Sequence, residues 1–169
     1  MARMFVALNF PDPLCDQIAR EAKSLARIDP LADFCPGTDL HLTLAFVGEA
    51  TEAQAAQLHA ALAPLGSLVP REIQTGYLEV FQRAGVLTLG IQPRNALKDV
   101  AKAVRRELRA LNLPFDERPF KPHITLARRW RRQLRNPVFT TFTLPLSRPV
   151  VMFSERDPRT NLIRYRQFI

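Results

Sequence analysis

The chain has 169 residues, of which 47% are hydrophobic and 24% are charged, and its formal net charge is +8. This length and composition fit one globular domain, or one domain built from two similar halves, and they exclude a largely disordered chain. No apolar run approaches the roughly 20 residues of a membrane-spanning helix, and the short, polar start does not resemble a secretory signal, so we expect a cytoplasmic protein.

The first half of the chain predicts two strands that are each followed by a helix. Short apolar runs predict the strands at residues 4–9 and 40–47, and apolar residues at helical spacing predict a helix at residues 12–28. A second helix is predicted from its cap Thr51 to about Leu65. Pro and Gly residues mark the boundaries between these elements.

The second half predicts a hairpin, one long amphipathic helix and several strands. The expected elements are the hairpin 72–81 and 86–91, the helix 95–113 with Asn95 as its cap, the strand 122–127, an Arg-rich loop or short helix 128–135, and strands 138–144, 150–153 and 162–168. Because the strand runs come in pairs that look antiparallel, we predict an α+β fold and not an alternating parallel sheet.

A four-residue pattern, H-x-T-L, occurs twice, as HLTL at residues 41–44 and as HITL at residues 123–126. Side chains on a strand alternate between two faces, so the His and the Thr of each copy share one face while the apolar residues point to the other. The chain has only three histidines, and two of them open this pattern. Two such strands around one cleft would present two imidazoles and two hydroxyls to a single ligand.

This set of groups suits a phosphodiester. In-line attack at phosphorus needs a base for the nucleophile and an acid for the leaving oxygen, and His41 and His123 can serve either role near neutral pH. The hydroxyls of Thr43 and Thr125 would donate hydrogen bonds to the non-bridging oxygens, and Arg128 would add a positive charge. The scheme requires no metal and no other cofactor.

Other interpretations of these residues stay open. A lone histidine on a strand is usually structural, and Thr is common in strands; His59, in a predicted helix without a companion Thr, is expected to be structural or exposed. A zinc site would need a third and usually a fourth ligand, which H-x-T does not supply. Cys35 lies close to His41, but we expect Cys15 and Cys35 to be buried reduced thiols.

The chain resembles the 2H phosphoesterase superfamily, whose signature is a pair of H-x-[ST]-x motifs. Within it, the chain is similar to the bacterial RNA 2′,3′-cyclic phosphodiesterases, also called 2′-5′ RNA ligases. The similarity rests on four segments that span nearly the whole chain: MFVALNF, DLHLTLAFVGE, RPFKPHITLARR and the helix 95–113.

The resemblance implies one bilobal α+β domain over residues 1–169, with two intertwined lobes. Two pseudo-symmetric antiparallel sheets with outer helices would enclose a central cleft. The implied reaction is metal-independent hydrolysis of a terminal 2′,3′-cyclic phosphate of RNA to a 2′-phosphomonoester, and some members also join tRNA halves reversibly through a 2′-5′ linkage. His41 would protonate the departing 3′ oxygen and His123 would activate water, although the near symmetry of the site leaves this division open.

The resemblance also places Phe46 where the family has an apolar residue near the base, with core packing as the alternative. The stretch RRWRRQLR at residues 128–135 suits phosphate contacts, with Trp130 for base stacking, or it forms a solvated loop. We expect a monomer whose partner is RNA or a nucleotide with a 2′,3′-cyclic phosphate, with no membrane involved. The alternative function is a non-catalytic basic RNA-binding module that holds a phosphate end, because excess Arg favours polyanions in general.

Overall fold

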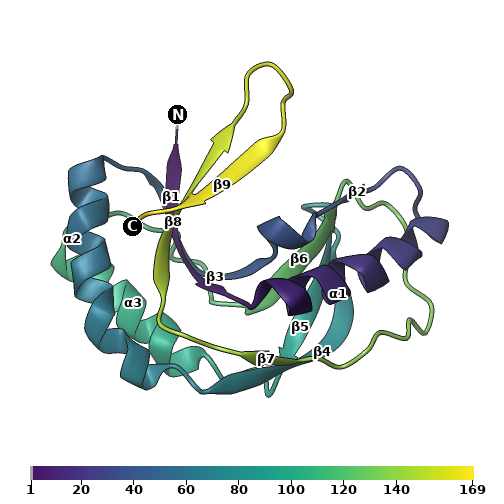
Figure 1. The fold of residues 1–169 in the computed structure, drawn as a ribbon, viewed down its shortest axis with the longest axis horizontal. Helices are drawn as coiled ribbons and strands as arrows, with labels where there is room; N and C mark the ends of the chain where they lie inside the picture. The colour runs from purple at the N-terminus through teal and green to yellow at the C-terminus, as the bar shows by residue number, and fades with distance from the viewer. Residues whose placement is uncertain (1) are drawn as a thin grey trace.

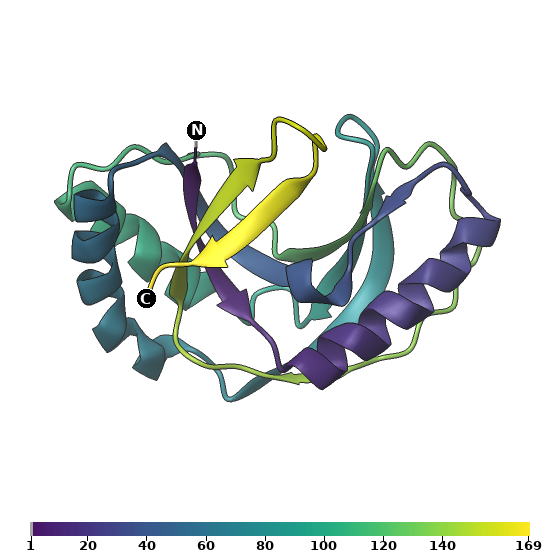
Figure 2. The same ribbon diagram turned by 45° about the horizontal axis from the view of Figure 1, so that its top comes forward.

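The computed structural model describes residues 2–169 as three helices around a curled antiparallel sheet (Figures 1 and 2). The strands are β1 (Arg3–Asn9), β2 (Asp33–Phe34), β3 (His41–Glu49), β4 (Glu72–Phe81), β5 (Val86–Gln92), β6 (His123–Arg128), β7 (Thr143–Pro145), β8 (Val150–Arg156) and β9 (Ile163–Gln167). The helices are α1 (Asp12–Lys23), α2 (Glu52–Leu62) and α3 (Lys98–Ala110). The predicted α+β class is confirmed.

The sheet consists of two halves that meet at its centre. The strand order is β7-β4-β5-β6-β3-β1-β8-β9, and the short strand β2 pairs with β6. The halves are joined where β3 runs antiparallel to β6 and Leu42 lies opposite Ile124. The two antiparallel sheets predicted from the sequence are therefore continuous through this contact.

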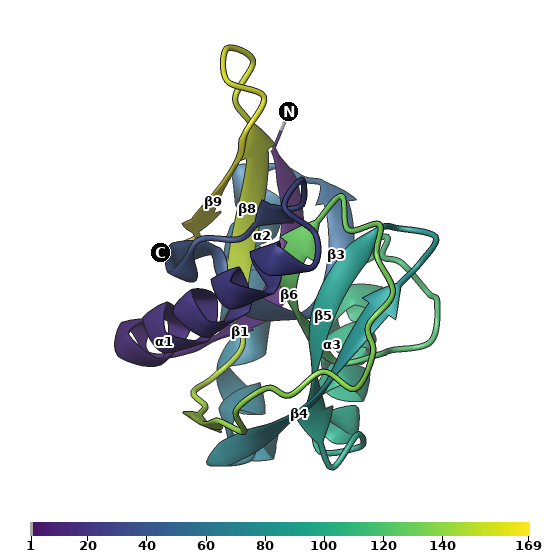
Figure 3. The same cartoon turned by 90° about the vertical axis from the view of Figure 1, so that its right-hand side faces the viewer.

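The helices cover the two halves differently. Helices α2 and α3 pack together, with α3 against β3 and α2 against β8, while α1 contacts β2 in the other half (Figure 1). The buried face of α3 consists of Val100, Ala101, Ala103, Val104 and Leu108. Strands β8 and β9 form a hairpin that projects beyond the rest of the sheet (Figure 3). Within residues 2–169, none of the helices is long and apolar enough to cross a membrane.

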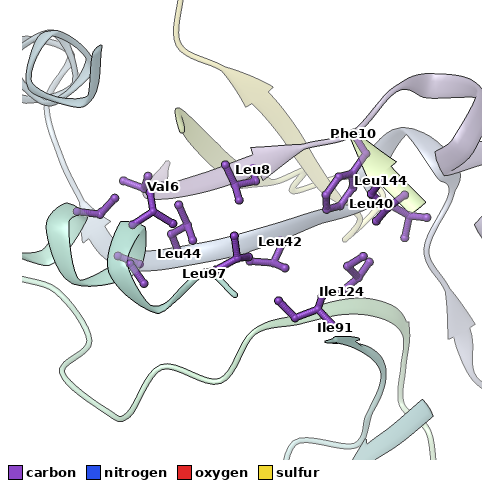
Figure 4. Packing of buried hydrophobic residues seen from close by; sticks show 14 of the residues in the cluster. Val6, Leu8, Phe10, Leu40, Leu42, Leu44, Ile91, Leu97, Ile124 and Leu144 are labelled. Carbon is purple, nitrogen blue, oxygen red and sulfur yellow. The ribbon is translucent and has the colours of Figure 1, made fainter. Parts of the chain in front are cut away.

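The apolar residues of the two H-x-T-L motifs belong to the main core. Leu42 and Leu44 from β3 lie with Ile124 from β6 among side chains of β1, β5 and the start of α3 (Figure 4). All three are almost completely buried. Because side chains alternate along a strand, this burial turns the His and Thr of each motif to the opposite face of the sheet.

Several predicted boundaries are wrong for local reasons. The helix predicted at 12–28 ends at Lys23 and continues as a single turn of 3-10 helix, Ser24–Arg27. The second helix ends at Leu62, before Pro64, which has no N–H to donate to a helix. Helix α3 begins at Lys98, so Asn95 does not cap it.

The strand predicted at residues 138–144 is also wrong at its beginning. Only Thr143–Pro145 pairs, with β4, and Val138 is 91% exposed. Phe142, just before this strand, makes two hydrogen bonds to the buried Thr75 of β4: its backbone N–H donates to the hydroxyl at 2.8 Å, and its carbonyl accepts from the backbone N–H at 2.9 Å. The two-residue strand β2 is too short to leave a periodic signal in the sequence.

The central contact between the halves predicts a large loss of stability on truncation. Ile124→Ala is expected to lower the free energy of unfolding by about 2–5 kcal/mol, because it removes buried methyl groups and leaves a cavity. Urea denaturation measures this change. Val138→Ala, at a position that is 91% exposed, is the control and should stay within about 0.5 kcal/mol of the parent protein. A loss for Ile124→Ala no larger than that of the control would contradict this role of the contact.

Candidate functional site

The antiparallel contact between β3 and β6 brings the two H-x-T-L motifs side by side. Leu42 lies opposite Ile124, and both point into the core. In an antiparallel pair, the residue before one partner lies opposite the residue after the other. The register therefore brings the His of each motif next to the Thr of the other, on the face away from the core.

A cavity of about 510 Å³ opens on this face. It contains all six residues singled out from the sequence: His41, Thr43, Phe46, His123, Thr125 and Arg128. The structure thus brings together, from β3 and β6, every candidate residue of the predicted site. Their roles in chemistry stay predictions.

The two imidazoles are anchored in the same way. Nδ1 of His41 lies 2.7 Å from the backbone carbonyl oxygen of Asp39, and Nδ1 of His123 lies 2.8 Å from that of Lys121. A carbonyl oxygen can only accept a hydrogen bond, so Nδ1 carries the hydrogen in both rings. In the neutral form this leaves a lone pair on Nε2 of each ring, where a proton can be taken up or released.

Aromatic side chains fix the planes of the two rings. The ring of His41 lies 5.1 Å from that of Phe5 and 5.1 Å from that of Tyr165, measured between centroids. The ring of His123 meets that of Phe81 edge-on at 4.8 Å. Contacts of this kind hold an imidazole in one orientation. The two histidines therefore share an anchor but differ in their surroundings.

These aromatic neighbours were not predicted from the sequence. Residues 4–8 are all apolar, so the sequence does not show which of them face away from the main core; in the structure Phe5 lies on the opposite face of β1 from Met4 and Val6. The contact of Tyr165 with His41 left no signal either, because β9 is remote in the chain and reaches the site only through its pairing with β8.

Burial and positive charge both lower the pKa of the two histidines. Burial is the larger cause for His41, and Arg128 and His123 add to it, while the hydrogen bond to the Asp39 carbonyl acts in the opposite direction. For His123, burial again comes first and the charges of Lys121 and Arg128 add to it. Both pKa values therefore lie below the ordinary value of about 6.5, and the neutral imidazole predominates at pH 7.

Arginine side chains make the cavity positive. Arg3, Arg118 and Arg128 line it. Arg118 is paired with Asp116, and the hydrogen bonds from Arg118 lower the pKa of the Asp116 carboxyl to about 2. Arg128 is exposed and makes no ion pair or side-chain hydrogen bond with any residue in 2–169. Its guanidinium is therefore available to an anion in the cavity.

The three aromatic side chains for which alternatives stayed open are in different environments. Phe46 is 55% exposed, so the alternative that it packs in the core is wrong. Trp130 is 2% exposed and its indole N–H donates to the carbonyl of Arg132, so the base-stacking interpretation is wrong for this residue. His59 packs against Phe168 outside the cavity.

The two cysteines lie outside the site's chemistry. Burial raises the pKa of the Cys15 thiol to about 11, and it also raises that of Cys35, so neither is an activated thiolate. In the part of the chain that the structure describes, no three His, Cys, Asp or Glu side chains gather into a group that could hold a metal ion.

The known proteins that are similar to this chain belong to one family. A family model for the 2′-5′ RNA ligase superfamily matches residues 10–155. The chain is 28% identical over 159 residues to the RNA 2′,3′-cyclic phosphodiesterase of Bacillus subtilis, which covers 90% of this chain and 83% of the relative. It is 30% identical over 135 residues to a protein of the same name from Aquifex aeolicus, which covers 76% and 71%.

The fold is also similar to that of solved structures. The structure of E. coli LigT in complex with 3′-AMP superimposes with a TM-score of 0.77 at 24% identity, over 99% of this chain and 95% of that chain. The predicted fold class and the predicted family resemblance are therefore both confirmed.

The charge environment of the histidines is open to a direct test. Arg128→Gln is expected to raise the pKa of both His41 and His123, because it removes a positive charge that disfavours the imidazolium form. An NMR pH titration of the histidine Cε1 protons measures both values. Arg131→Gln removes an exposed charge that does not contribute to either shift and is the control. Unchanged values in Arg128→Gln, or equal shifts in both variants, would rule out the proposed influence of Arg128.

Proposed function

The chain belongs to the 2′-5′ RNA ligase superfamily, and from this membership we propose that it hydrolyses the terminal 2′,3′-cyclic phosphate of RNA to a 2′-phosphomonoester. The observation that carries the proposal is the pair of imidazoles, each anchored through Nδ1, that line one cavity together with two threonines. Relatives from Bacillus subtilis and Aquifex aeolicus that carry the name RNA 2′,3′-cyclic phosphodiesterase support it.

In the proposed reaction, the neutral imidazole of His123 takes a proton from water through Nε2 while the water oxygen attacks phosphorus. The bond between phosphorus and the 3′ oxygen breaks, and the protonated imidazole of His41 gives its proton to that oxygen. The products are a 2′-phosphomonoester and a free 3′ hydroxyl, and the two rings end with their protonation states exchanged. The charges around the two rings do not distinguish the acid from the base, because Arg128 lowers the pKa of both histidines and Glu79, paired with Lys121, acts against the effect of Lys121 on His123.

The other residues would hold the phosphate. The hydroxyls of Thr43 and Thr125 would donate hydrogen bonds to the non-bridging oxygens, whose charge has to be stabilised in the transition state. Arg128 would add a full positive charge to the same group. Phe46, which is exposed in the same cavity, would contact the base.

Ligation would use the same phosphorus and the same leaving oxygen as hydrolysis. A 5′ hydroxyl of a second RNA would replace water as the nucleophile, so His123 would again take the proton of the nucleophile and His41 would again protonate the departing 3′ oxygen. The two histidines would exchange roles only in the reverse reaction, when the 3′ hydroxyl attacks the 2′-5′ linkage and the 5′ oxygen leaves. Incubation with one RNA that ends in a cyclic phosphate and another that begins with a 5′ hydroxyl distinguishes the two activities, because only ligation gives a 2′-5′-linked product.

A binding module without catalysis is the competing function, because the basic cavity would also hold a phosphate end. Both histidines present Nε2 with a defined tautomer, an arrangement that binding alone does not need. RNA affinity and turnover measured on one preparation separate the two: tight binding with no turnover would favour the binding module.

We further propose that the protein acts as a cytoplasmic monomer.

Removal of either imidazole is expected to abolish most of the activity. His41→Ala and His123→Ala should each lower kcat for a nucleoside 2′,3′-cyclic phosphate by roughly 10²–10⁴-fold, the usual contribution of general acid–base catalysis. Formation of the 2′-phosphate is measured in the presence of EDTA, which should leave the rate unchanged.

The third histidine gives the control for these variants. His59→Ala, which lies outside the cavity, should retain the parent rate. Full activity in both site variants, or loss of activity with EDTA in the parent protein, would refute the proposed mechanism.

The lowered pKa values predict an acidic optimum. The base must be neutral, so the rate falls as the pH drops below its pKa, and the acid must be protonated, so the rate falls as the pH rises above its pKa. Since both values lie below 6.5 in the free protein, a bell-shaped profile of kcat/KM should have its maximum below about pH 6.5. Circular dichroism at each pH controls for unfolding. A maximum at alkaline pH would contradict the two-histidine assignment.

A further inference from the structure

A second positive groove lies along α3, outside the cavity that holds the histidines. Its volume is about 580 Å³. Five cationic side chains line it: Arg94, Lys98, Lys102, Arg105 and Arg109. The rest of its lining is Asn95, Ala101, Phe120 and Pro122, so it contains no carboxylate. We call it the α3 groove.

The sequence of α3 turns these charges outward. Lys98, Lys102, Arg105 and Arg109 are spaced by four, three and four residues, which places them on one face of a helix. At 1.5 Å per residue this row is about 16 Å long. Like charges at such spacing destabilise a helix on its own. Lys98 and Lys102, at the start of the row, therefore gain nothing from the helix itself, whereas an anionic ligand would neutralise them.

The cations at the start of the row, Lys98 and Lys102, have the fewest polar partners. The carboxylate of Glu117 lies 3.8 Å from Arg109, and Arg105 donates to the backbone carbonyl of Arg118 at 2.7 Å. Lys98 and Lys102 are exposed and make no ion pair or hydrogen bond to another side chain among residues 2–169. These two ammonium groups are free to contact a ligand.

One short segment separates the α3 groove from the cavity. Phe120 and Pro122 line the groove, while Arg118 and His123 line the cavity. The hydrogen bond from Arg105 to the carbonyl of Arg118 ties this segment to α3. Residues 118–122 therefore lie between the histidines of the cavity and the row of cations on α3.

Two other grooves share Arg128 with the cavity, and both have a smaller excess of positive charge. One, beside the turn between β4 and β5, has a volume of about 500 Å³ and four cations, Arg83, Arg128, Arg129 and Arg131. The other is larger. It lies between α1 and the β8–β9 hairpin and has a volume of about 1370 Å³. Arg20, Lys23, Arg128, Arg129 and Arg156 line it, but so do Asp16, Asp33 and Asp39. Arg129 is paired with Asp33. Charge complementarity to a polyanion therefore favours the α3 groove.

We propose that the α3 groove binds the sugar–phosphate backbone of the RNA strand whose 3′ end occupies the cavity. This inference rests on the proposed function and extends it from a terminal phosphate to an RNA strand. Sites for single-stranded nucleic acid combine a positive groove with aromatic rings for stacking, and Phe120 supplies such a ring beside the cations. An oligonucleotide substrate should therefore be preferred over a cyclic mononucleotide.

The test uses the double variant Lys98→Gln/Lys102→Gln. For an oligoribonucleotide of about eight nucleotides with a terminal 2′,3′-cyclic phosphate, a length within the usual 4–16 per site, KM is expected to rise about tenfold or more. For a nucleoside 2′,3′-cyclic phosphate, kcat and KM of the variant should stay within about twofold of the parent values, because the mononucleotide does not reach α3. The slope of log affinity against log salt should decrease by about 1.4, since each contact to a single-stranded phosphate contributes about 0.7.

The matched control is Arg20→Gln/Lys23→Gln, which removes the same charge from the groove beside α1. It should change the oligonucleotide KM much less than the α3 variant does. An equal rise in both variants, or no rise in the α3 variant, would overturn the inference.

Affinity for the same oligonucleotide with a plain 3′ phosphate, measured by fluorescence anisotropy, does not depend on turnover. If the parent protein hydrolyses neither the cyclic mononucleotide nor the oligonucleotide, the proposed function fails, and this measurement still decides whether the α3 groove binds RNA.

Discussion

The antiparallel contact of Leu42 with Ile124 is the interaction on which the site depends. It is the point where the two halves of the sheet meet, and both side chains are completely buried in the core. A slip of one residue in this register would turn every side chain of the shifted strand to the other face. The same burial that stabilises the fold therefore determines that two imidazoles and two hydroxyls face one cavity. Stability and site geometry cannot be separated here, because alternate residues of the same strands supply both.

The two halves contribute equivalent anchors and different surroundings. A backbone carbonyl two residues before each histidine accepts the hydrogen of Nδ1, so both rings present the same nitrogen to the cavity. His41 then packs between Phe5 and Tyr165, whereas His123 meets Phe81 and lies near Lys121. A general acid and a general base need the same reactive atom but opposite protonation states. In the proposed reaction, the duplicated motif would supply the same reactive nitrogen twice, and the unlike surroundings would let one ring act as acid and the other as base.

The excess positive charge of the chain is not spread evenly over its surface. Arginines line the cavity, and a row of cations continues along α3 on the other side of a short segment. Several other arginines are neutralised by exposed carboxylates, as in the pairs Arg129–Asp33 and Arg166–Glu52. Unpaired cations line both the cavity and the α3 groove, where the proposed RNA would lie, which connects part of the net charge of +8 to the proposed substrate.

The sequence by itself determined the features that depend on local periodicity. Alternation in H-x-T-L predicted which face each His and Thr would share, and helical spacing predicted the buried face of α3. The α+β class followed from the order of these local patterns. Other features have no local pattern in the sequence, and only the tertiary structure decided them. Residues 42 and 124 become neighbours, and Phe5, Phe81 and Tyr165 surround the imidazoles. Trp130 is buried although it lies in an Arg-rich segment. These outcomes depend on which distant surfaces pack together, and packing is a property of the whole core and not of any single stretch of residues.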